Sequence, residues 1–188
     1  MLAKPFDLGD GLQLRAASRD DTEALIALVR HNVAQLGRYL PPVAEILTAE
    51  AAAAHFDLAD RQIAEGKLID WHVFQDGVLC GEIRLNYIEE INRKSAVAYF
   101  LDQRYQGRGI ISRALARVLE HAFVELAFNR IELRCIVTNT PSRRVAERAG
   151  FVLEGRLRQA DFLEGRFQDD FVFSLLASEY KPPARHAG

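Results

Sequence analysis

The chain has 188 residues, of which 49% are hydrophobic and 27% are charged, and its formal net charge is −2. This length allows one domain with a full core, and the balanced charge excludes a protein-wide basic field for nucleic acid or membrane surfaces. No apolar run approaches the roughly 20 residues of a membrane span, and none follows Met1 as a signal peptide would require. We expect one cytoplasmic domain over residues 1–188, with its core at about 11–180 and a flexible tail at 181–188.

The first third of the chain predicts a strand and two helices. Alternating apolar residues in Gly11–Ala17 predict a strand with one buried face. Ser18 is suited to cap a helix that ends at Tyr39-Leu40-Pro41-Pro42, and an alanine-rich helix follows from about Thr48 to Gly66. The apolar stripe of the first helix consists of Leu25, Leu28, Val29 and Val33.

The middle of the chain predicts a hairpin, a strand and a third helix. Asp70–Gln75 and Val78–Ile88 are expected to pair, because the Asp76-Gly77 between them is typical of a hairpin turn. Ser95–Asp102 predicts a fourth strand. Apolar residues at helical spacing then predict a helix from about Gly107 to Phe128.

The last third predicts one more helix between strands. Ile131–Thr138 reads as a strand, and Thr140 is suited to cap a helix with Pro141 at its first position. Gly150 is suited to end that helix. The remaining strands of the expected sheet are Phe151–Leu163 and Phe167–Leu176.

The turn between the fourth strand and the third helix indicates a phosphate site. Its sequence is Arg104-Tyr105-Gln106-Gly107-Arg108-Gly109-Ile110-Ile111-Ser112. The glycines permit close approach of a ligand, and the helix start offers free N–H groups. Ser112 replaces the third glycine of a dinucleotide fingerprint, and no Gly-Lys-Ser/Thr of a P-loop follows. We expect the amides from Gln106 to Ile111 to bind phosphate, although a plain glycine turn would have the same pattern.

Arginine and cysteine distributions add to this interpretation. The arginines cluster beside the glycines and beside the last helix, which favours a polyanionic ligand. These arginines are Arg104, Arg108, Arg113, Arg117, Arg143, Arg144 and Arg148. Cys80 and Cys135 lie far apart in apolar runs and predict buried free thiols. No Cys or His pair has zinc-ligand spacing, so no metal is expected.

A second motif makes the pattern more specific. Asn139-Thr140-Pro141-Ser142 follows a strand and precedes Glu147-Arg148-Ala149-Gly150-Phe151. Together with Arg-x-x-Gly-x-Gly, this order resembles the GNAT superfamily of acetyl-CoA-dependent N-acetyltransferases, over about Leu12–Tyr180. Tyr105–Ser112 and Leu153–Ala160 resemble in particular the RimJ/RimL group, which acetylates the N-termini of ribosomal proteins.

The resemblance implies a fold, a co-substrate and a set of binding residues. The fold would be the α/β GNAT fold, with a mixed, mostly antiparallel sheet of seven strands and about four helices. The co-substrate would be acetyl-CoA, without a metal, and a homodimer is a family-level expectation. The fourth strand would splay from the fifth, so that pantetheine pairs beside it. The implied binding residues are Phe100, Leu101, Gln106, Gly107, Arg108, Gly109, Ile110, Ile111, Ser112 and Asn139.

The resemblance also assigns roles in acetyl transfer. Ser142 would protonate the leaving thiolate, and Asp161 would take the amine proton, directly or through water. Asn139 would hold a pantetheine amide, or it caps the helix. Glu82 and Glu132 are alternative bases, but each has an arginine two positions on and reads better as an ion pair. Trp71, His72 and Tyr99 read as core residues, with a smaller chance that Trp71 or Tyr99 lines the acceptor channel.

The acceptor stays open at this stage. The RimJ/RimL resemblance favours a protein N-terminus attacked within a ternary complex, with no acetyl-enzyme, because neither cysteine lies at the glycine loop. A polyamine, an amino acid or an antibiotic would use the same chemistry. A non-catalytic CoA-binding module is the alternative from another class.

Overall fold

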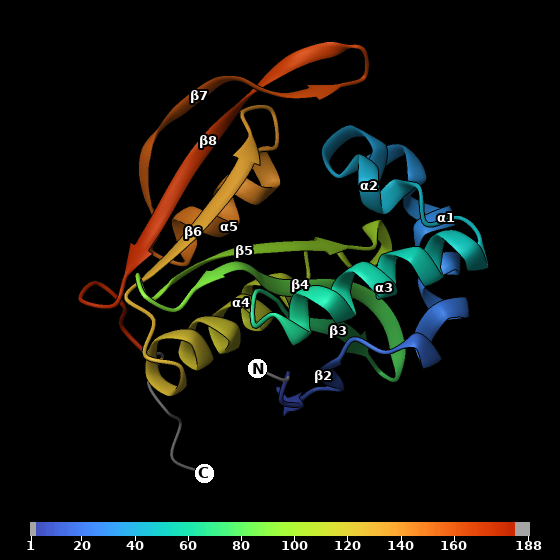
Figure 1. Ribbon diagram of the computed structural model, residues 1–188, viewed down its shortest axis with the longest axis horizontal. Coiled ribbons are helices and arrows are strands. Elements are labelled where there is room, and N and C mark those ends of the chain that lie inside the picture. Colours follow the sequence, from blue (N-terminus) through green and yellow to red (C-terminus); the bar gives the residue numbers. More distant parts are fainter. Residues whose placement is uncertain (1–2, 183–188) are drawn as a thin grey trace.

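The computed structural model describes residues 3–182, and its sheet contains eight strands in the order β1-β2-β3-β4-β5-β6-β8-β7 (Figure 1). The strands are β1 Phe6–Asp7, β2 Leu12–Ala16, β3 Ile69–Gln75, β4 Val78–Glu89, β5 Lys94–Leu101, β6 Arg130–Ile136, β7 Val152–Leu163 and β8 Arg166–Leu176. All neighbours are antiparallel except β5 and β6. The predicted mixed α/β sheet is confirmed, with β1 as one strand more than expected. Most of the predicted tail, residues 183–188, lies outside the described residues.

Five α-helices cover the two faces of this sheet (Figure 1). They are α1 Thr22–Tyr39, α2 Pro41–Ala44, α3 Ala49–Ala64, α4 Ile110–Glu120 and α5 Thr140–Arg148. One apolar core joins α1–α3 to the sheet at Phe74, Leu79 and Phe100. The larger core packs α4 and α5 on the opposite face. None of the helices among residues 3–182 has the length and apolar character needed to cross a membrane.

Several predicted helix boundaries are wrong. The third helix was expected from Gly107, but Gly107 and Gly109 both have φ near +75°, so α4 begins only at Ile110. Its C-terminal continuation, His121–Glu125, is a π-helical turn. The break after Tyr39 is real, but it is followed at once by the short helix α2, because proline suits the first turn of a helix.

The buried stripe of α1 also differs from the prediction. Val33 remains 43% exposed, whereas Asn32 is only 2% exposed. Asn32 can occupy a buried position because its Nδ2 donates to Leu28 O at 2.8 Å and its Oδ1 accepts from Gln103 N at 2.9 Å. The amide therefore ties α1 to the turn that follows β5, and buried polar groups are tolerated when they are bonded in this way.

The parallel pair β5–β6 separates along its length, as Figure 1 shows. Register pairs join Lys94–Val97 to Arg130–Leu133 and stop there. On its other edge β5 stays paired with β4 as far as Leu101 opposite Gly81. The strand is thus held in place from one side while its C-terminal half faces an opening on the other.

Gly81 allows β4 to approach the C-terminal end of β5, and we predict that Gly81→Ala destabilises the fold. An added Cβ would lie 2.4 Å from Phe100 O and 3.1 Å from Leu101 Cδ1. Overpacking of this kind costs about 1–3 kcal/mol, and urea unfolding followed by circular dichroism measures it. Gly155→Ala is the control, because its Cβ would meet nothing within 4 Å. Equal unfolding midpoints for the parent and Gly81→Ala would contradict the prediction.

Candidate active site

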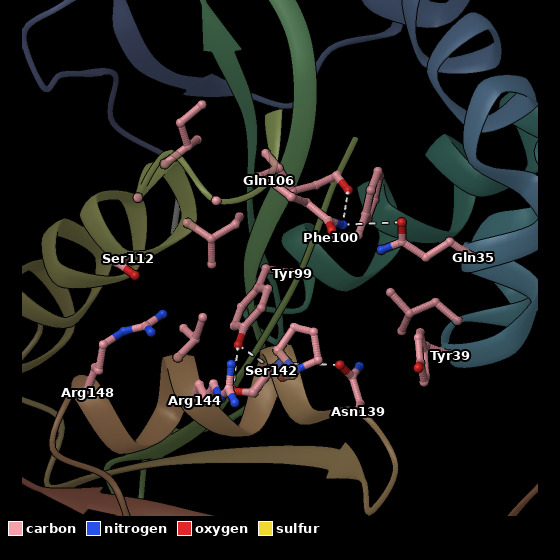
Figure 2. A pocket seen from close by; sticks show the side chains of 18 of the residues that line it. Gln35, Tyr39, Tyr99, Phe100, Gln106, Ser112, Asn139, Ser142, Arg144 and Arg148 are labelled. Atoms are coloured by element: carbon pink, nitrogen blue, oxygen red, sulfur yellow. Dashed lines mark hydrogen bonds between the residues drawn. The ribbon is translucent and has the colours of Figure 1, made fainter. Parts of the chain in front are cut away.

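A cavity of about 550 Å³ lies at the opening of the sheet, between the end of β5, the starts of α4 and α5, and the C-terminal half of α1 (Figure 2). It contains most of the residues that the sequence predicts for binding and catalysis. These are Phe100, Leu101, Gln106, Gly107, Gly109, Ile110, Ile111, Ser112, Asn139 and Ser142. The side chain of Arg108 lies outside the lining, with its guanidinium 5.3 Å from the centre of the Tyr105 ring.

The glycine turn presents its backbone amides to this cavity. From Gly107 to Ser112 no N–H group donates to another described residue, and the first helical bond is Arg113 N to Gly109 O at 3.0 Å. The amide of Gln106 donates to Gln103 O at 3.2 Å, so the free amides of the turn begin at Gly107. Unpaired amides at a helix start carry partial positive charge, so this turn fits a diphosphate.

The turn is held in place by a buried carboxylate, Asp102, which is 1% exposed. Its Oδ1 accepts from the Arg104 amide at 2.9 Å, and the Arg104 guanidinium donates to both of its oxygens. Burial disfavours ionisation of Asp102, but the bonds from Arg104 outweigh burial and lower its pKa. The charged network fixes the turn before any ligand arrives.

Gln106 links the two walls of the cavity. Its side-chain Nε2 lies 3.2 Å from Oε1 of Gln35 in α1 and 3.4 Å from the carbonyl oxygen of Leu101 (Figure 2). Two arginines of α5, Arg144 and Arg148, also line the cavity, and neither forms an ion pair with a described residue. The other clustered arginines bond to protein groups or stack on an aromatic ring, so among the described residues Arg144 and Arg148 are the clustered arginines whose guanidinium groups are without such a contact.

Asn139 and Ser142 meet at the start of α5. Asn139 Oδ1 accepts from Ser142 N at 3.2 Å, so Asn139 is the cap and the predicted cap Thr140 is the first helical residue, with Pro141 second. The Nδ2 of Asn139 has no described acceptor, so capping leaves it able to donate to a ligand carbonyl. The two roles considered for Asn139 are therefore compatible.

Ser142 contacts two residues that sequence reasoning placed in the core. Its Oγ lies 3.0 Å from the hydroxyl of Tyr99, which lines the cavity (Figure 2), and it also contacts the Cys135 thiol. The alternation of side chains along a strand places Tyr99 on the same face as Leu101, and this pattern in the sequence could have indicated that Tyr99 lies at the site. Burial raises the pKa of Tyr99 to about 12 and that of Cys135 to about 11. Cys135 is therefore a protonated thiol at neutral pH and a poor nucleophile.

Asp161 does not line this first cavity. It lies in a second cavity of about 620 Å³, which is bounded by β5, β6 and the β7–β8 hairpin. The two cavities share Tyr39 and Leu40 as a common wall. The charged residues around the second cavity are Glu89, Lys94, Glu132, Arg134, Asp161 and Asp170. Asp170 was not found in the sequence, because it reads there as one polar position of a strand.

The alternative bases are engaged in ion pairs, as the sequence suggests. Glu82 is 3% exposed and pairs with Arg84, whose Nη2 also lies 2.8 Å from Asp70 Oδ2. Burial opposes ionisation of Glu82, but Arg84 outweighs it and lowers the pKa of Glu82 to about 2. A carboxylate with this pKa is a weak base, and Glu82 lines neither cavity.

The remaining candidates also bond to other side chains or to the backbone. Glu132 pairs with Arg130 at 3.1 Å and with Arg134 at 3.4 Å. His72 Nδ1 lies 2.7 Å from Asp21 Oδ2, and the side chain of His72 is fully buried. Trp71 is also fully buried, and its Nε1 donates to Lys4 O at 2.8 Å. The core positions predicted for His72 and Trp71 are confirmed.

The fold and the site have the features of a CoA-dependent acyltransferase: a splayed parallel pair, a helix start with free amides, and a polar cap on the next helix. A family profile described as "Acetyltransferase (GNAT) domain" matches residues 12–152. The chain therefore belongs to the GNAT acetyltransferase family, and its co-substrate is acetyl-CoA.

Individual relatives extend over nearly the whole chain. The putative ribosomal N-acetyltransferase YdaF of Bacillus subtilis is 32% identical over 176 residues, which cover 93% of this chain and 96% of that protein. The ribosomal-protein-serine acetyltransferase of Escherichia coli is 31% identical over 179 residues, covering 93% and 98%. A solved structure of RimL, a ribosomal alpha-N-protein acetyltransferase, in complex with coenzyme A has a TM-score of 0.87 and 29% identity, with 92% and 98% covered.

Proposed function

We propose that this enzyme acetylates the α-amino group of a protein N-terminus, of the kind found on ribosomal proteins. The carrying observation is that a second cavity with four carboxylates and two cations adjoins the cofactor cavity at Tyr39 and Leu40. An ammonium group is attracted by such a surplus of negative charge. The wall of the cavity includes the β7–β8 hairpin as well as Tyr39 and Leu40 at the end of α1, and in the proposed complex the peptide N-terminus lies between these elements.

The pattern of relatives supports a peptide over a polyamine. The relatives named for ribosomal proteins match over nearly their full length. The spermidine N(1)-acetyltransferase of Vibrio cholerae matches over 54% of this chain and 59% of its own length, at 31% identity. The part of the chain that matches this polyamine enzyme is thus smaller than the part that matches the enzymes named for ribosomal proteins.

Each group of the chain has a defined task in the proposed reaction. Acetyl-CoA supplies an activated acetyl group and a thiolate leaving group. The amides from Gly107 to Ser112, with Arg144 and Arg148, would hold its phosphates. The unpaired edge of β5 at Phe100 and Leu101 would orient the pantetheine arm, and Asn139 Nδ2 would donate to it. Ser142 would give its proton to the departing sulfur and regain one through Tyr99, while Asp161 would receive the proton of the amine.

A thiol-release assay with acetyl-CoA tests the acceptor. The panel contains short peptides with free N-terminal serine or alanine, the same peptides with a blocked N-terminus, and spermidine. We expect the free peptides to have the highest kcat/KM and the blocked peptides to be inactive. A higher kcat/KM for spermidine would overturn the proposal in favour of a small amine, and CoA binding without turnover of any amine would favour a binding module.

A further inference from the structure

Asp170 lies in β8, beside Asp161 of β7, at the second cavity. Both carboxyl groups line that cavity, and the charge of Asp161 acts on the Asp170 carboxyl. They differ in environment, since Asp161 is exposed whereas Asp170 is 7% exposed. The Oδ1 of Asp170 is buried and has no hydrogen-bond partner among the described residues. A buried carboxyl oxygen without a partner is costly, so this one invites a functional explanation.

Among the described residues, the charged groups around Asp170 do not form an ion pair with its carboxylate. On its own strand, Asp169 is engaged by the Arg156 guanidinium and by the Gln159 amide at 2.7 Å. On β6, Arg134 is paired with Glu132 at 3.4 Å and forms no ion pair with Asp170. Besides these groups, the residues with charge at the same cavity are Glu89 and Lys94, which pair with each other at 3.0 Å.

Burial and the neighbouring carboxylate change the acidity of Asp170. Burial raises the pKa of Asp170 to about 6, and the charge of Asp161 adds to the rise, while Arg134 acts against it. An aspartate with the ordinary pKa of about 4 is a far weaker base towards an α-ammonium group with a pKa near 8. The proton affinity of Asp170 is thus closer to that of the acceptor amine.

We propose that Asp161 and Asp170 act as one proton-accepting pair, in which buried Asp170 stores the proton that the acceptor ammonium loses and exposed Asp161 passes it to water. The inference rests on the proposed function and deepens it, because it defines the acceptor as a cationic amine that enters the second cavity.

The proton balance of the reaction is closed by this pair. The ammonium gives one proton to the pair and becomes a neutral amine, whose nitrogen forms the C–N bond as the C–S bond breaks. The thiolate gains its proton from Ser142, and the second proton, which leaves the nitrogen when the amide is formed, replenishes Ser142 through Tyr99. One proton per turnover is released to solvent, and Asp161 is the exposed group through which it leaves.

The pH dependence of kcat/KM for a free N-terminal peptide tests the pair. In the parent enzyme kcat/KM should fall as the pH drops through about 6, the value of Asp170. In Asp170→Asn this limb should disappear, and kcat/KM at pH 7.5 should drop about 100-fold, the lower end of the range for lost acid–base catalysis. The change in kcat/KM near pH 8, which comes from ionisation of the α-amino group of the free peptide, should stay in every variant. In Asp169→Asn the limb should remain but move below 6, because the charge of Asp169 also raises the pKa of Asp170. An Asp170→Asn enzyme that retains the limb would overturn the proposal.

Unfolding against pH gives a readout that does not depend on turnover. Because the pKa of Asp170 is raised in the folded protein, its contribution to stability is present below about pH 4 and is lost as the pH rises through about 6. Asp170→Asn should therefore unfold at a higher urea concentration than the parent at pH 7.5, with a smaller difference at pH 4. A merely structural Asp170 predicts the opposite, a destabilised variant at pH 7.5.

These two experiments separate the proposals. If no amine is acetylated by any variant, the proposed function fails, while the unfolding result still decides whether Asp170 is a strained proton site. If peptides are acetylated but Asp170→Asn is destabilised and keeps its acid limb, the function stands and the proton pair is refuted.

Discussion

Replacing Ser142 with alanine is expected to lower kcat about 100-fold, the lower end of the range for loss of a general acid, while the Kd for acetyl-CoA stays within about twofold. The hydroxyl lies 3.0 Å from Tyr99 Oη and faces the cavity at the point where β5 and β6 part. The cap of α5 survives the substitution, since Asn139 accepts from the backbone amide of residue 142. Thiol-release kinetics and calorimetric titration with acetyl-CoA measure the two quantities.

Thr140→Ala is the matched control for this variant. Thr140 is an exposed hydroxyl residue in the same helical turn, and it does not line the cavity. We expect its kcat and Kd to equal those of the parent. If Ser142→Ala instead weakens acetyl-CoA binding and leaves kcat unchanged, Ser142 holds the co-substrate and is not an acid.

Gly107→Asp is expected to weaken acetyl-CoA binding about 30-fold. The turn has room for the side chain, because a Cβ at Gly107 meets nothing within 4 Å. One added negative charge at roughly 8 Å from a phosphate costs about 2 kcal/mol in an effective dielectric of 20, and tenfold in Kd corresponds to about 1.4 kcal/mol. Titration at low and at high salt measures the effect, and the loss should shrink at high salt.

Gly107→Asn separates charge from backbone strain in this test. Gly107 has φ +75°, a conformation that asparagine and aspartate tolerate better than other side chains. The two variants therefore have the same shape and a similar strain, and they differ in charge. If Asn weakens binding as strongly as Asp, the loss comes from the altered turn, and the phosphate site lies elsewhere.

The sequence was informative where a local signal decides the structure. Asp76-Gly77 defines a hairpin because two residues with positive φ suit few other pairs, and both have φ above +50°. The glycines before Ile110 and the proline after Thr140 likewise locate two helix starts. The phosphate turn and Ser142 were therefore found from short motifs, and their meeting in one cavity follows from the strands that precede them.

The features that were missed depend on contacts distant in sequence. β1 has two residues and exists only because Phe6 pairs opposite Leu14. Asp161 of β7 and Asp170 of β8 are brought to the same cavity by a register shift between Leu157 and Asp161. Counting alternate residues along a strand does not predict where such a shift occurs. The sequence allows Asn139 to be a cap or a ligand, and only the structure shows that its Oδ1 accepts from Ser142 N while its Nδ2 has no acceptor among the described residues.

The separation of β5 from β6 has a consequence for altering this enzyme. The gap is created by main-chain register, because pairing stops after Val97 and Leu133. The side chains line the gap, but they do not create it. Random substitution at Glu89, Lys94 or Arg134 should thus change which amines the enzyme accepts. Binding of the CoA phosphates should stay unchanged, because the main-chain amides that would bind them lie on another element.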